Sequence, residues 1–276
     1  MIRADLHMHT YFSDGKYSPE EVVRRVKQAG VSLFSVTDHD SMEGIERAAE
    51  AAKKAGLLFV RGMEISAYSE SGKVHVLGYC CNKNADYDRF IKERVEGSYT
   101  RAEDSLKKGN AYFGTRLTME DVEAFHGEKN TPLHTMHVID AFAKELSRTR
   151  AELYRNVFSL GKPAYSGLCR PSPRSAVEVI HAMGGIACLA HPAQISRERA
   201  ERYAVAEALK EAGLDGIECY HSVHTERETA EFIAYAKENG LLITGGSDFH
   251  EEGKERVLGL PAFYPSDALL EALGLS

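Results

Sequence analysis

The sequence predicts an α/β protein built on a largely parallel sheet, with a helical lobe inserted into it. The first observation is a series of seven short apolar runs that indicate strands, at residues 2–6, 33–36, 57–60, 74–79, 186–190, 216–220 and 241–244. The second is that helical patterns separate most of these runs, which is typical of parallel strands covered on both faces. The third is that residues 82–182 break this alternation with consecutive helical patterns. Periodicity alone leaves an open doubly wound sheet and a barrel as alternatives.

The predicted helices begin and end at residues that are typical of helix termini. Ser18 is expected to cap a first helix, because Pro19 follows at the first helical position and Glu21 lies three residues after the cap. An apolar stripe over residues 22–29 gives this helix a buried face, and Gly30 ends it.

The segment between the fourth and fifth strands contains helical patterns throughout. Residues 87–95 repeat apolar side chains at helical spacing, and residues 118–121 contain a helix start. Residues 137–146 and 150–160 continue the series. We expect this insertion either to cover the open end of the sheet or to select the substrate.

Composition limits the classes of function. The chain has 276 residues, of which 43% are hydrophobic and 27% charged, as expected for a globular α/β protein. Its net charge of −7 argues against a general nucleic-acid-binding protein, which usually carries a basic face, but permits a small anionic substrate. The five cysteines include no CxxC pair, so neither a disulfide framework nor a cysteine zinc site is indicated.

The same features favour a cytoplasmic location. An odd number of cysteines in apolar runs is typical of a reducing compartment. The amino-terminal residues lack the basic and apolar regions of a signal peptide. No apolar stretch reaches the roughly 18 residues of a membrane span, so we expect no membrane partner.

Imidazole and carboxylate side chains follow the predicted strands. The candidates, in chain order, are His7, His9, Asp14, His39, Glu64, His75, His191, His221, His224, Asp248 and His250. Taken singly, several have ordinary explanations: His75 as a core histidine, Asp14 as a turn residue, and Asp38 to Asp40 as helix capping. Ligands of parallel α/β folds bind at the carboxyl ends of the strands, so the combination favours one shared site.

The residue types indicate a cluster of metal ions. His7 and His9 lie two residues apart on a strand, so both rings point to the same side, and Asp248 and His250 have the same spacing. Mixed imidazole and carboxylate ligands suit Zn, Mn or Fe better than Ca or Mg. The donors are too many for one ion, and two or three ions with Glu64 as a bridge fit better. Such ions activate water at neutral pH and neutralise the charge on phosphoryl oxygens. The sequence contains no GxSxG elbow, no Walker A loop and no GxGxxG motif.

Five motifs, in order, resemble those of the PHP (polymerase and histidinol phosphatase) family. They are Asp5-Leu6-His7-Met8-His9-Thr10 with Ser13-Asp14-Gly15, Val36-Thr37-Asp38-His39-Asp40, Gly62-Met63-Glu64-Ile65-Ser66, Ala190-His191-Pro192 and Gly246-Ser247-Asp248-Phe249-His250. The resemblance covers residues 1–82 and 161–262. Within the family, the sequence is most similar to the stand-alone TrpH/YciV-like phosphoesterases, which carry a helical insertion.

The resemblance implies a distorted (β/α)7 TIM-like barrel, formed by residues 1–82 and 161–276, with a helical cap lobe at residues 83–160. It also implies a site of three ions, with Mn, Fe or Zn as the metals and a metal-bridging hydroxide as the nucleophile. The implied ligands are His7, His9, Glu64 and Asp248 for the first ion, Glu64, His75 and His191 for the second, and Asp14, His39 and His250 for the third.

Three further residues are candidates for substrate binding. Relatives often carry an Arg-Pro-His segment in the insertion, and the comparable segment here keeps His134 but has Thr131 in place of the arginine. Arg170 is a candidate for clamping a phosphate instead. His224 matches a position that contacts phosphate in similar enzymes.

These observations favour a metal-dependent phosphoesterase acting on small phosphorylated metabolites. Nucleotide and sugar phosphates are the expected substrates, including cyclic phosphodiesters that are opened and then hydrolysed as monoesters. One alternative is a 5′-to-3′ exonuclease on short RNA or DNA oligonucleotides, although no stable nucleic-acid complex is expected at this net charge. Another is a non-catalytic, metal-stabilised PHP module, which the complete set of ligand positions argues against.

Overall fold

The computed structural model describes residues 1–69, 72–126, 131–253 and 256–275. It contains a single seven-stranded sheet in which each strand neighbours the next along the chain. The strands are β1 (Ala4–Asp5), β2 (Leu33–Val36), β3 (Leu58–Ser69), β4 (Gly72–Tyr79), β5 (Ile186–Leu189), β6 (Gly216–His221) and β7 (Leu242–Gly246). Each predicted run overlaps one of these strands, so the predicted α/β class is confirmed.

The sheet is mixed, which corrects the expected direction of one strand. β1, β2 and β3 pair in parallel, as do β5, β6 and β7, but β4 runs antiparallel to both β3 and β5. The pairing of Ser69 with Gly72 leaves only two residues between β3 and β4. A parallel pair needs a crossover of about a dozen residues, so this short connection permits only a hairpin.

The first and last strands meet, so the sheet nearly closes into the distorted barrel that the motifs implied. The Leu6 amide donates to the Gly245 carbonyl at 3.0 Å, and Met8 forms a parallel bridge with Phe249. Beyond these strands, the Asp248 amide donates to the His7 carbonyl at 2.9 Å. This closure brings the segment of His7 and His9 beside the segment of Asp248 and His250.

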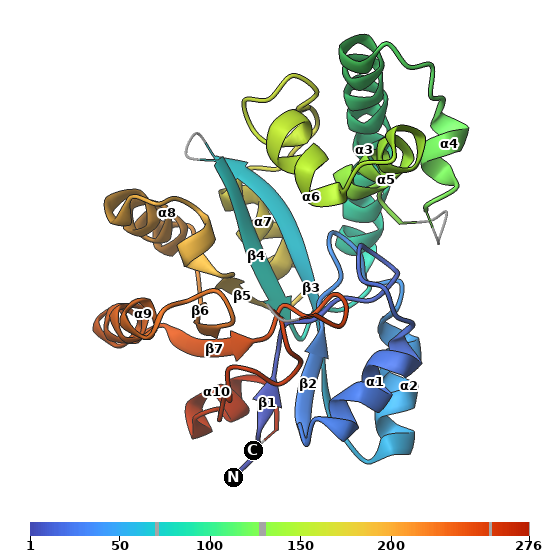
Figure 1. The fold of residues 1–276 in the computed structure, drawn as a ribbon. Coiled ribbons are helices and arrows are strands. Elements are labelled where there is room, and N and C mark those ends of the chain that lie inside the picture. Colours follow the sequence, from blue (N-terminus) through green and yellow to red (C-terminus); the bar gives the residue numbers. More distant parts are fainter. Residues whose placement is uncertain (70–71, 127–130, 254–255, 276) are drawn as a thin grey trace. The chain divides into compact units, whose positions relative to one another are not determined.

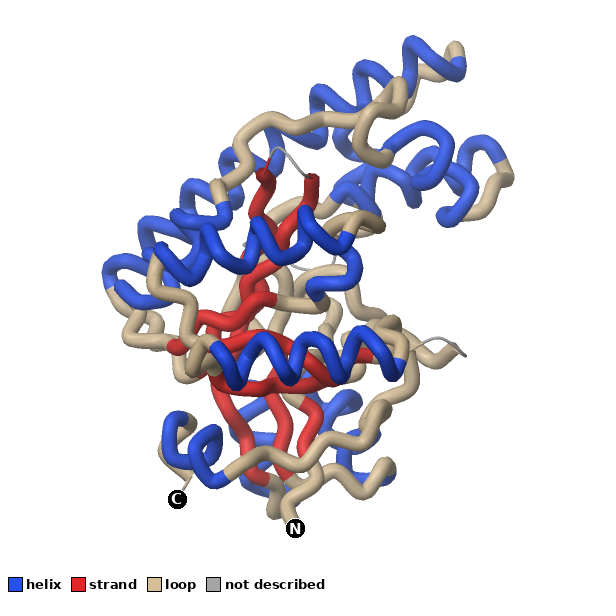
Figure 2. Tube along the Cα trace, turned by 90° about the vertical axis from the view of Figure 1, so that its left-hand side faces the viewer, coloured by secondary structure: helices blue, strands red, loops and turns tan. Residues whose placement is uncertain are grey.

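Helices surround the strands of the barrel (Figures 1 and 2). They are α1 (Pro19–Gln28), α2 (Ile45–Ala55), α7 (Pro173–Ala182), α8 (Arg199–Glu211), α9 (Glu226–Glu238) and α10 (Asp267–Ala272), with a 3-10 turn at Pro192–Gln194. The predicted start of α1 is confirmed, because the Ser18 hydroxyl accepts a hydrogen bond from the Glu21 amide. The barrel core includes Leu6, Leu33, Val60 and Leu77, all of which are buried.

The chain divides into two compact units, Met1–Asp88 with Pro171–Ser276 and Arg89–Arg170. The second unit contains most of α3 (Ala85–Phe113), followed by α4 (Met119–Glu123), α5 (Thr135–Leu146), α6 (Arg150–Leu153) and a π-helical turn at Tyr154–Phe158. Its own core contains Phe142 and Phe158. This unit begins six residues and ends ten residues beyond the predicted lobe at 83–160, and the role of a cap lobe stays a prediction. None of the helices in the described residues is both long and apolar enough to cross a bilayer.

Gly246 is expected to be essential for closing the barrel. A Cβ atom at this position would lie 2.3 Å from the Cβ of His7 and 2.5 Å from the His7 amide nitrogen. Since backbone would have to move, Gly246→Ala should destabilise the fold by about 3 kcal/mol. Thermal denaturation should show a fall in Tm of roughly 6 to 12 °C. Gly253→Ala is the matched control, because no described atom lies within 4 Å of its added Cβ; equal Tm values for the two variants would contradict this reasoning.

Candidate metal centre

The polar side chains at the carboxyl ends of the strands converge on Glu64. It lies on β3 and is fully buried, and its two carboxylate oxygens are shared among five imidazoles. Oε2 lies 3.3 Å from His7 Nε2, 3.3 Å from His9 Nε2 and 3.0 Å from His39 Nδ1. Oε1 lies 2.6 Å from His75 Nδ1 and 2.9 Å from His191 Nε2. A carboxylate in this position has the geometry of a bridging ligand.

An inner group consists of His7, His9, Glu64 and Asp248, whose donor atoms lie within 4.8 Å of one another. Asp248 Oδ1 lies 3.4 Å from His7 Nε2 and 3.1 Å from His9 Nε2. All four side chains are buried. The backbone of Asp248 has a φ of 55°, in the left-handed region that side chains other than glycine rarely adopt. Such strain is common where a fold fixes a functional group.

An outer group consists of His9, Asp14, His39 and His250. Asp14 Oδ1 lies 3.1 Å from His250 Nε2, 3.9 Å from His39 Nε2 and 4.0 Å from His9 Nδ1. The Nδ1 atom of His250 lies 2.8 Å from the Asp248 carbonyl oxygen. Burial lowers the pKa of His250, but Asp14 and Asp248 outweigh it and raise that pKa to about 9, so a cation shared with Asp14 would replace the Nε2 proton.

The remaining pair, His75 and His191, lies on the other side of Glu64. Their Nδ1 and Nε2 atoms are 3.2 Å apart and both contact Glu64 Oε1. The structure therefore brings together each of the three predicted ligand sets, although their assignment to metal ions stays a prediction. His191 also has a positive φ of 24°, directly before Pro192.

The electrostatics of the centre favour bound cations. Burial lowers the pKa of His9 to about 3, assisted by the neighbouring His250 and His39, and burial also holds the pKa of His75 well below its usual value. These rings are therefore neutral at physiological pH. Burial raises the pKa of Glu64, but the neighbouring imidazoles of His75, His39 and His7 outweigh it and hold that pKa well below its usual range. The carboxylates of the centre are ionised, as metal ligands must be. Burial lowers the pKa of His7 and His39, but the neighbouring carboxylates outweigh it and raise that pKa, so a metal ion bound by these two rings would replace a proton.

Buried atoms without hydrogen bonds test whether metal ions fit these residues. Within the described part of the chain, His7 Nε2, His9 Nε2 and Glu64 Oε2 are buried and have no hydrogen-bond partner. The same holds for Asp14 Oδ1 and His75 Nε2. Unsatisfied buried polar atoms are costly and rare in native proteins. Cations shared by these converging donors would satisfy them, so the residues fit divalent ions.

Glu218 forms hydrogen bonds with two residues of the centre, His7 and His191, and is not among the residues predicted from the sequence. Its Oε1 lies 3.0 Å from His7 Nδ1, and its Oε2 accepts a hydrogen bond from the His191 amide at 2.7 Å. Because His7 Nδ1–H donates to this carboxylate, His7 Nε2 presents its lone pair to the inner group. The signal in the sequence was a single carboxylate inside the apolar run at residues 216–220.

Other buried groups shape the surrounding loops. Asp5 accepts from the amides of Ser247 and Gly259 at 2.9 and 2.7 Å. Asp38 accepts from the Thr10 amide and hydroxyl at 2.7 and 2.6 Å, rather than capping a helix. His221 accepts from the Val223 amide through Nδ1, so its Nε2 carries the proton and lies 3.4 Å from Asp248 Oδ2.

The three substrate candidates lie in different units. His224 is in the barrel unit, where its Nδ1 lies 3.0 Å from the Cys219 carbonyl and its ring centroid lies 5.3 Å from that of His221. Burial lowers the pKa of His224 to about 4. His134 caps α5 and Arg170 donates to the Ser166 carbonyl at 3.4 Å, both in the second unit. Substrate binding by these residues stays a prediction.

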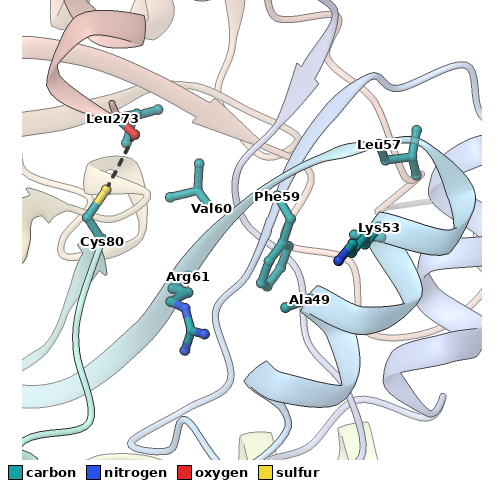
Figure 3. A pocket seen from close by; sticks show the side chains of 9 residues that line it. Ala49, Lys53, Leu57, Phe59, Val60, Arg61, Cys80 and Leu273 are labelled. Atoms are coloured by element: carbon teal, nitrogen blue, oxygen red, sulfur yellow. Dashed lines mark hydrogen bonds between the residues drawn. The ribbon is translucent and has the colours of Figure 1, made fainter. Parts of the chain in front are cut away.

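A separate cavity of about 500 Å³ lies at the amino-terminal end of β3 (Figure 3). Its lining includes Phe59, Lys53, Cys80 and Arg61, and the Arg61 guanidinium is paired with Glu46. None of the predicted ligand residues lines it. Ligands of barrels of this kind bind at the opposite, carboxyl end of the strands, so we place the functional site at the ligand cluster.

Comparisons with known proteins found a matching family model and several similar proteins. The sequence model of the PHP domain family matches residues 5–149. The chain is 32% identical over 89% of its length to the phosphoribosyl 1,2-cyclic phosphate 1,2-diphosphodiesterase of Eggerthella lenta, and it covers 93% of that protein. It is 29% identical, over 92% of its length, to the 3′,5′-nucleoside bisphosphate phosphatase of Chromobacterium violaceum, covering 89% of it. A 5′-3′ exoribonuclease of Haemophilus influenzae is 30% identical over 89% of both chains.

Two solved structures share the fold over almost the whole chain. One is a protein from Bifidobacterium adolescentis assigned as a metal-dependent phosphoesterase, with a TM-score of 0.86, 27% identity and coverage of 99% of this chain and 96% of that one. The other is an amidohydrolase from Chromobacterium violaceum with bound sulfate and no metal, with a TM-score of 0.86, 26% identity and coverage of 98% and 96%.

Proposed function

The chain belongs to the PHP domain family and is a metal-dependent phosphoesterase, and from this premise we propose that it hydrolyses small phosphorylated metabolites. Nucleotide and sugar phosphates are the proposed substrates, including cyclic phosphodiesters that are opened and then cleaved as monoesters. The observation that carries this proposal is the position of Glu64, whose two oxygens lie within 3.3 Å of five imidazole nitrogens.

The proposed centre holds two or three divalent ions. The inner group would hold one ion, Glu64 with His75 and His191 a second, and Asp14 with His39 and His250 a third. Mn, Fe or Zn suits this donor set. Bound there, the ions would supply Lewis acidity toward a phosphoryl group and activate water for attack on phosphorus.

The chain's own residues fix the ligands of the inner group. Glu218 selects the His7 tautomer, since it accepts the Nδ1 proton at 3.0 Å. His221 Nε2–H and the Arg256 guanidinium both face Asp248 Oδ2, at 3.4 and 2.7 Å, which leaves Oδ1 for the inner group. Pre-oriented ligands of this kind need no rearrangement when the charge on phosphorus changes.

The names of the relatives support a ribose phosphate as the substrate. The Eggerthella protein is named for a phosphoribosyl cyclic phosphate and the Chromobacterium protein for a nucleoside bisphosphate. A second candidate, 5′-to-3′ exonuclease activity on short oligonucleotides, is favoured by the similarity to the Haemophilus exoribonuclease. The net charge of −7 favours the small-molecule substrate, because phosphate contacts from basic residues dominate the affinity for nucleic acid polymers.

A substrate screen tests the proposal. Release of phosphate would be measured with added Mn²⁺ across nucleotides, nucleoside bisphosphates, sugar phosphates, cyclic phosphates and short oligonucleotides. Turnover of one of the small esters, abolished by a chelator and restored by metal, is the expected result. Turnover of oligonucleotides alone would favour the exonuclease, and turnover of none by the metal-loaded protein would overturn the proposal.

Arg170 is proposed to bind a phosphate of the substrate, which the variant Arg170→Ala tests. Loss of a charge-assisted hydrogen bond should raise KM by about tenfold, since such bonds contribute about 1.5 kcal/mol or more. The metal content should not change. Arg155→Ala is the matched control, because Arg155 is an exposed arginine of the same unit. An unchanged KM in Arg170→Ala would assign Arg170 to the solvated surface.

A further inference from the structure

We propose that Arg256 is a phosphate-binding residue of this centre, donating hydrogen bonds to the phosphoryl group from the solvent side of the outer group. The proposal rests on the proposed function, because it takes the ligand to be a phosphate ester or the phosphate released from it. Arg256 lies in the segment after β7, eight positions beyond Asp248.

The contacts of Arg256 fix one end of its guanidinium. Nη1 lies 2.7 Å from Asp248 Oδ2 and 3.3 Å from the Asp248 carbonyl oxygen, and 3.1 Å from His250 Nδ1. In the part of the chain that the structure describes, Nη1 makes each of these contacts, and its hydrogen bonds are to the Asp248 oxygens. Nε and Nη2 therefore remain as donors, in the fixed fork that matches the oxygens of a phosphate.

Exposure increases across the centre toward Arg256. The side chains of the inner group are 0 to 4% exposed, those of Asp14 and His250 are 17% and 19%, and that of Arg256 is 33%. An anion that enters from solvent can reach only the more exposed groups. Arg256 thus lies where an arriving phosphate would need a cation, beside the ligands of the outer group.

A simpler role for Arg256 is to balance the charge of Asp248. That role uses only Nη1, and the imidazole nitrogens of His7, His9 and His221 also lie within 3.4 Å of the Asp248 carboxylate. It would also leave two of the three guanidinium nitrogens without a function. Both roles use the same ion pair with Asp248, but they predict opposite results for phosphate binding and metal binding.

The test compares Arg256→Ala and Arg256→Lys with the wild-type protein, each loaded with the same metal. The Kd of inorganic phosphate would be measured by titration calorimetry without turnover, and KM, kcat and metal content would be measured in parallel. Arg256→Ala should raise the Kd of phosphate and the KM of the ester about tenfold, with unchanged metal content. Lysine should restore part of the affinity, since it keeps the charge but loses the fork. Arg227→Ala is the control, because Arg227 is 84% exposed and pairs with Glu231.

Two results would overturn the role of Arg256. One is a Kd of phosphate that differs by less than twofold between Arg256→Ala and wild type, and the other is a wild-type protein that binds no phosphate. A change in metal affinity with unchanged phosphate affinity would assign Arg256 to charge balance alone. Because phosphate binding is measured without turnover, failure of the substrate screen and failure of this inference remain distinguishable.

Discussion

Asp248→Asn and His9→Ala are each expected to reduce kcat/KM for a phosphoester by about 1,000-fold or more, equivalent to about 4 kcal/mol. Both residues belong to the inner group, where His9 Nε2 and Asp248 Oδ1 are 3.1 Å apart. Removing either donor leaves an ion with an incomplete shell, and metal ions supply several kcal/mol of stabilisation to a phosphoryl transition state. His9 belongs to both the inner and the outer group, so its loss should also lower the metal content.

The fold should survive both substitutions. Asparagine has the shape of aspartate, and both residues follow strands at the end of the barrel where function, rather than packing, constrains the sequence. The measurements are kcat/KM, metal content and Tm, all on metal-replete protein. His181→Ala is the control histidine variant, because His181 pairs with Asp215 outside the centre. Full turnover in both Asp248→Asn and His9→Ala would refute the metal-centre mechanism.

The seven strands could be predicted because each is a short apolar run between polar joints. The cluster could be predicted because its members follow strands that meet at one end of a barrel. The pair His7 and His9 illustrates this: two residues apart, their rings both lie within 3.3 Å of Glu64 Oε2. The spacing of residues along a strand and the position of the strand's end are therefore enough to predict where these side chains lie.

The direction of β4 and the length of β3 could not be predicted in the same way. The apolar run at residues 57–60 indicated a short strand, whereas β3 continues to Ser69 and forms a hairpin with β4. Pairing partners decide where a strand ends, and an apolar run does not reveal them. The sheet is largely parallel, as expected, and this hairpin places the one antiparallel strand among the described residues.

The roles of some polar residues could also not be predicted from the sequence. Arg256 lies in a polar segment where an arginine is usually a solvated side chain, and only the structure shows its ion pair with Asp248, eight positions earlier. Asp38 was considered a helix cap, but the fold makes it the acceptor for Thr10 and Ser13. Such roles depend on long-range geometry that spacing along the chain does not contain.

Glu218 should have the next largest effect, through the ligands that it holds. Its carboxylate is fully buried and accepts from two donors, with Oε1 3.0 Å from His7 Nδ1 and Oε2 2.7 Å from the His191 amide nitrogen. In Glu218→Gln, one of these two acceptors becomes an NH2 donor. Either the His7 ring or the His191 amide then faces a donor, which costs about 1 to 3 kcal/mol for a buried group.

The expected result of Glu218→Gln is a 10- to 100-fold loss of metal affinity or activity, as is typical when the partner of a ligating histidine is removed. Where the NH2 group faces His7, that ring loses the acceptor that holds its proton on Nδ1, and its Nε2 lone pair is no longer fixed toward the inner group. Metal affinity, kcat and Tm would be measured together, with Glu211→Gln on the surface of α8 as the control. A variant with a lower Tm but unchanged metal affinity and kcat would show that Glu218 serves only the stability of the barrel. A selective loss of metal affinity would instead show that a carboxylate outside the predicted ligand set determines how tightly the centre holds its ions.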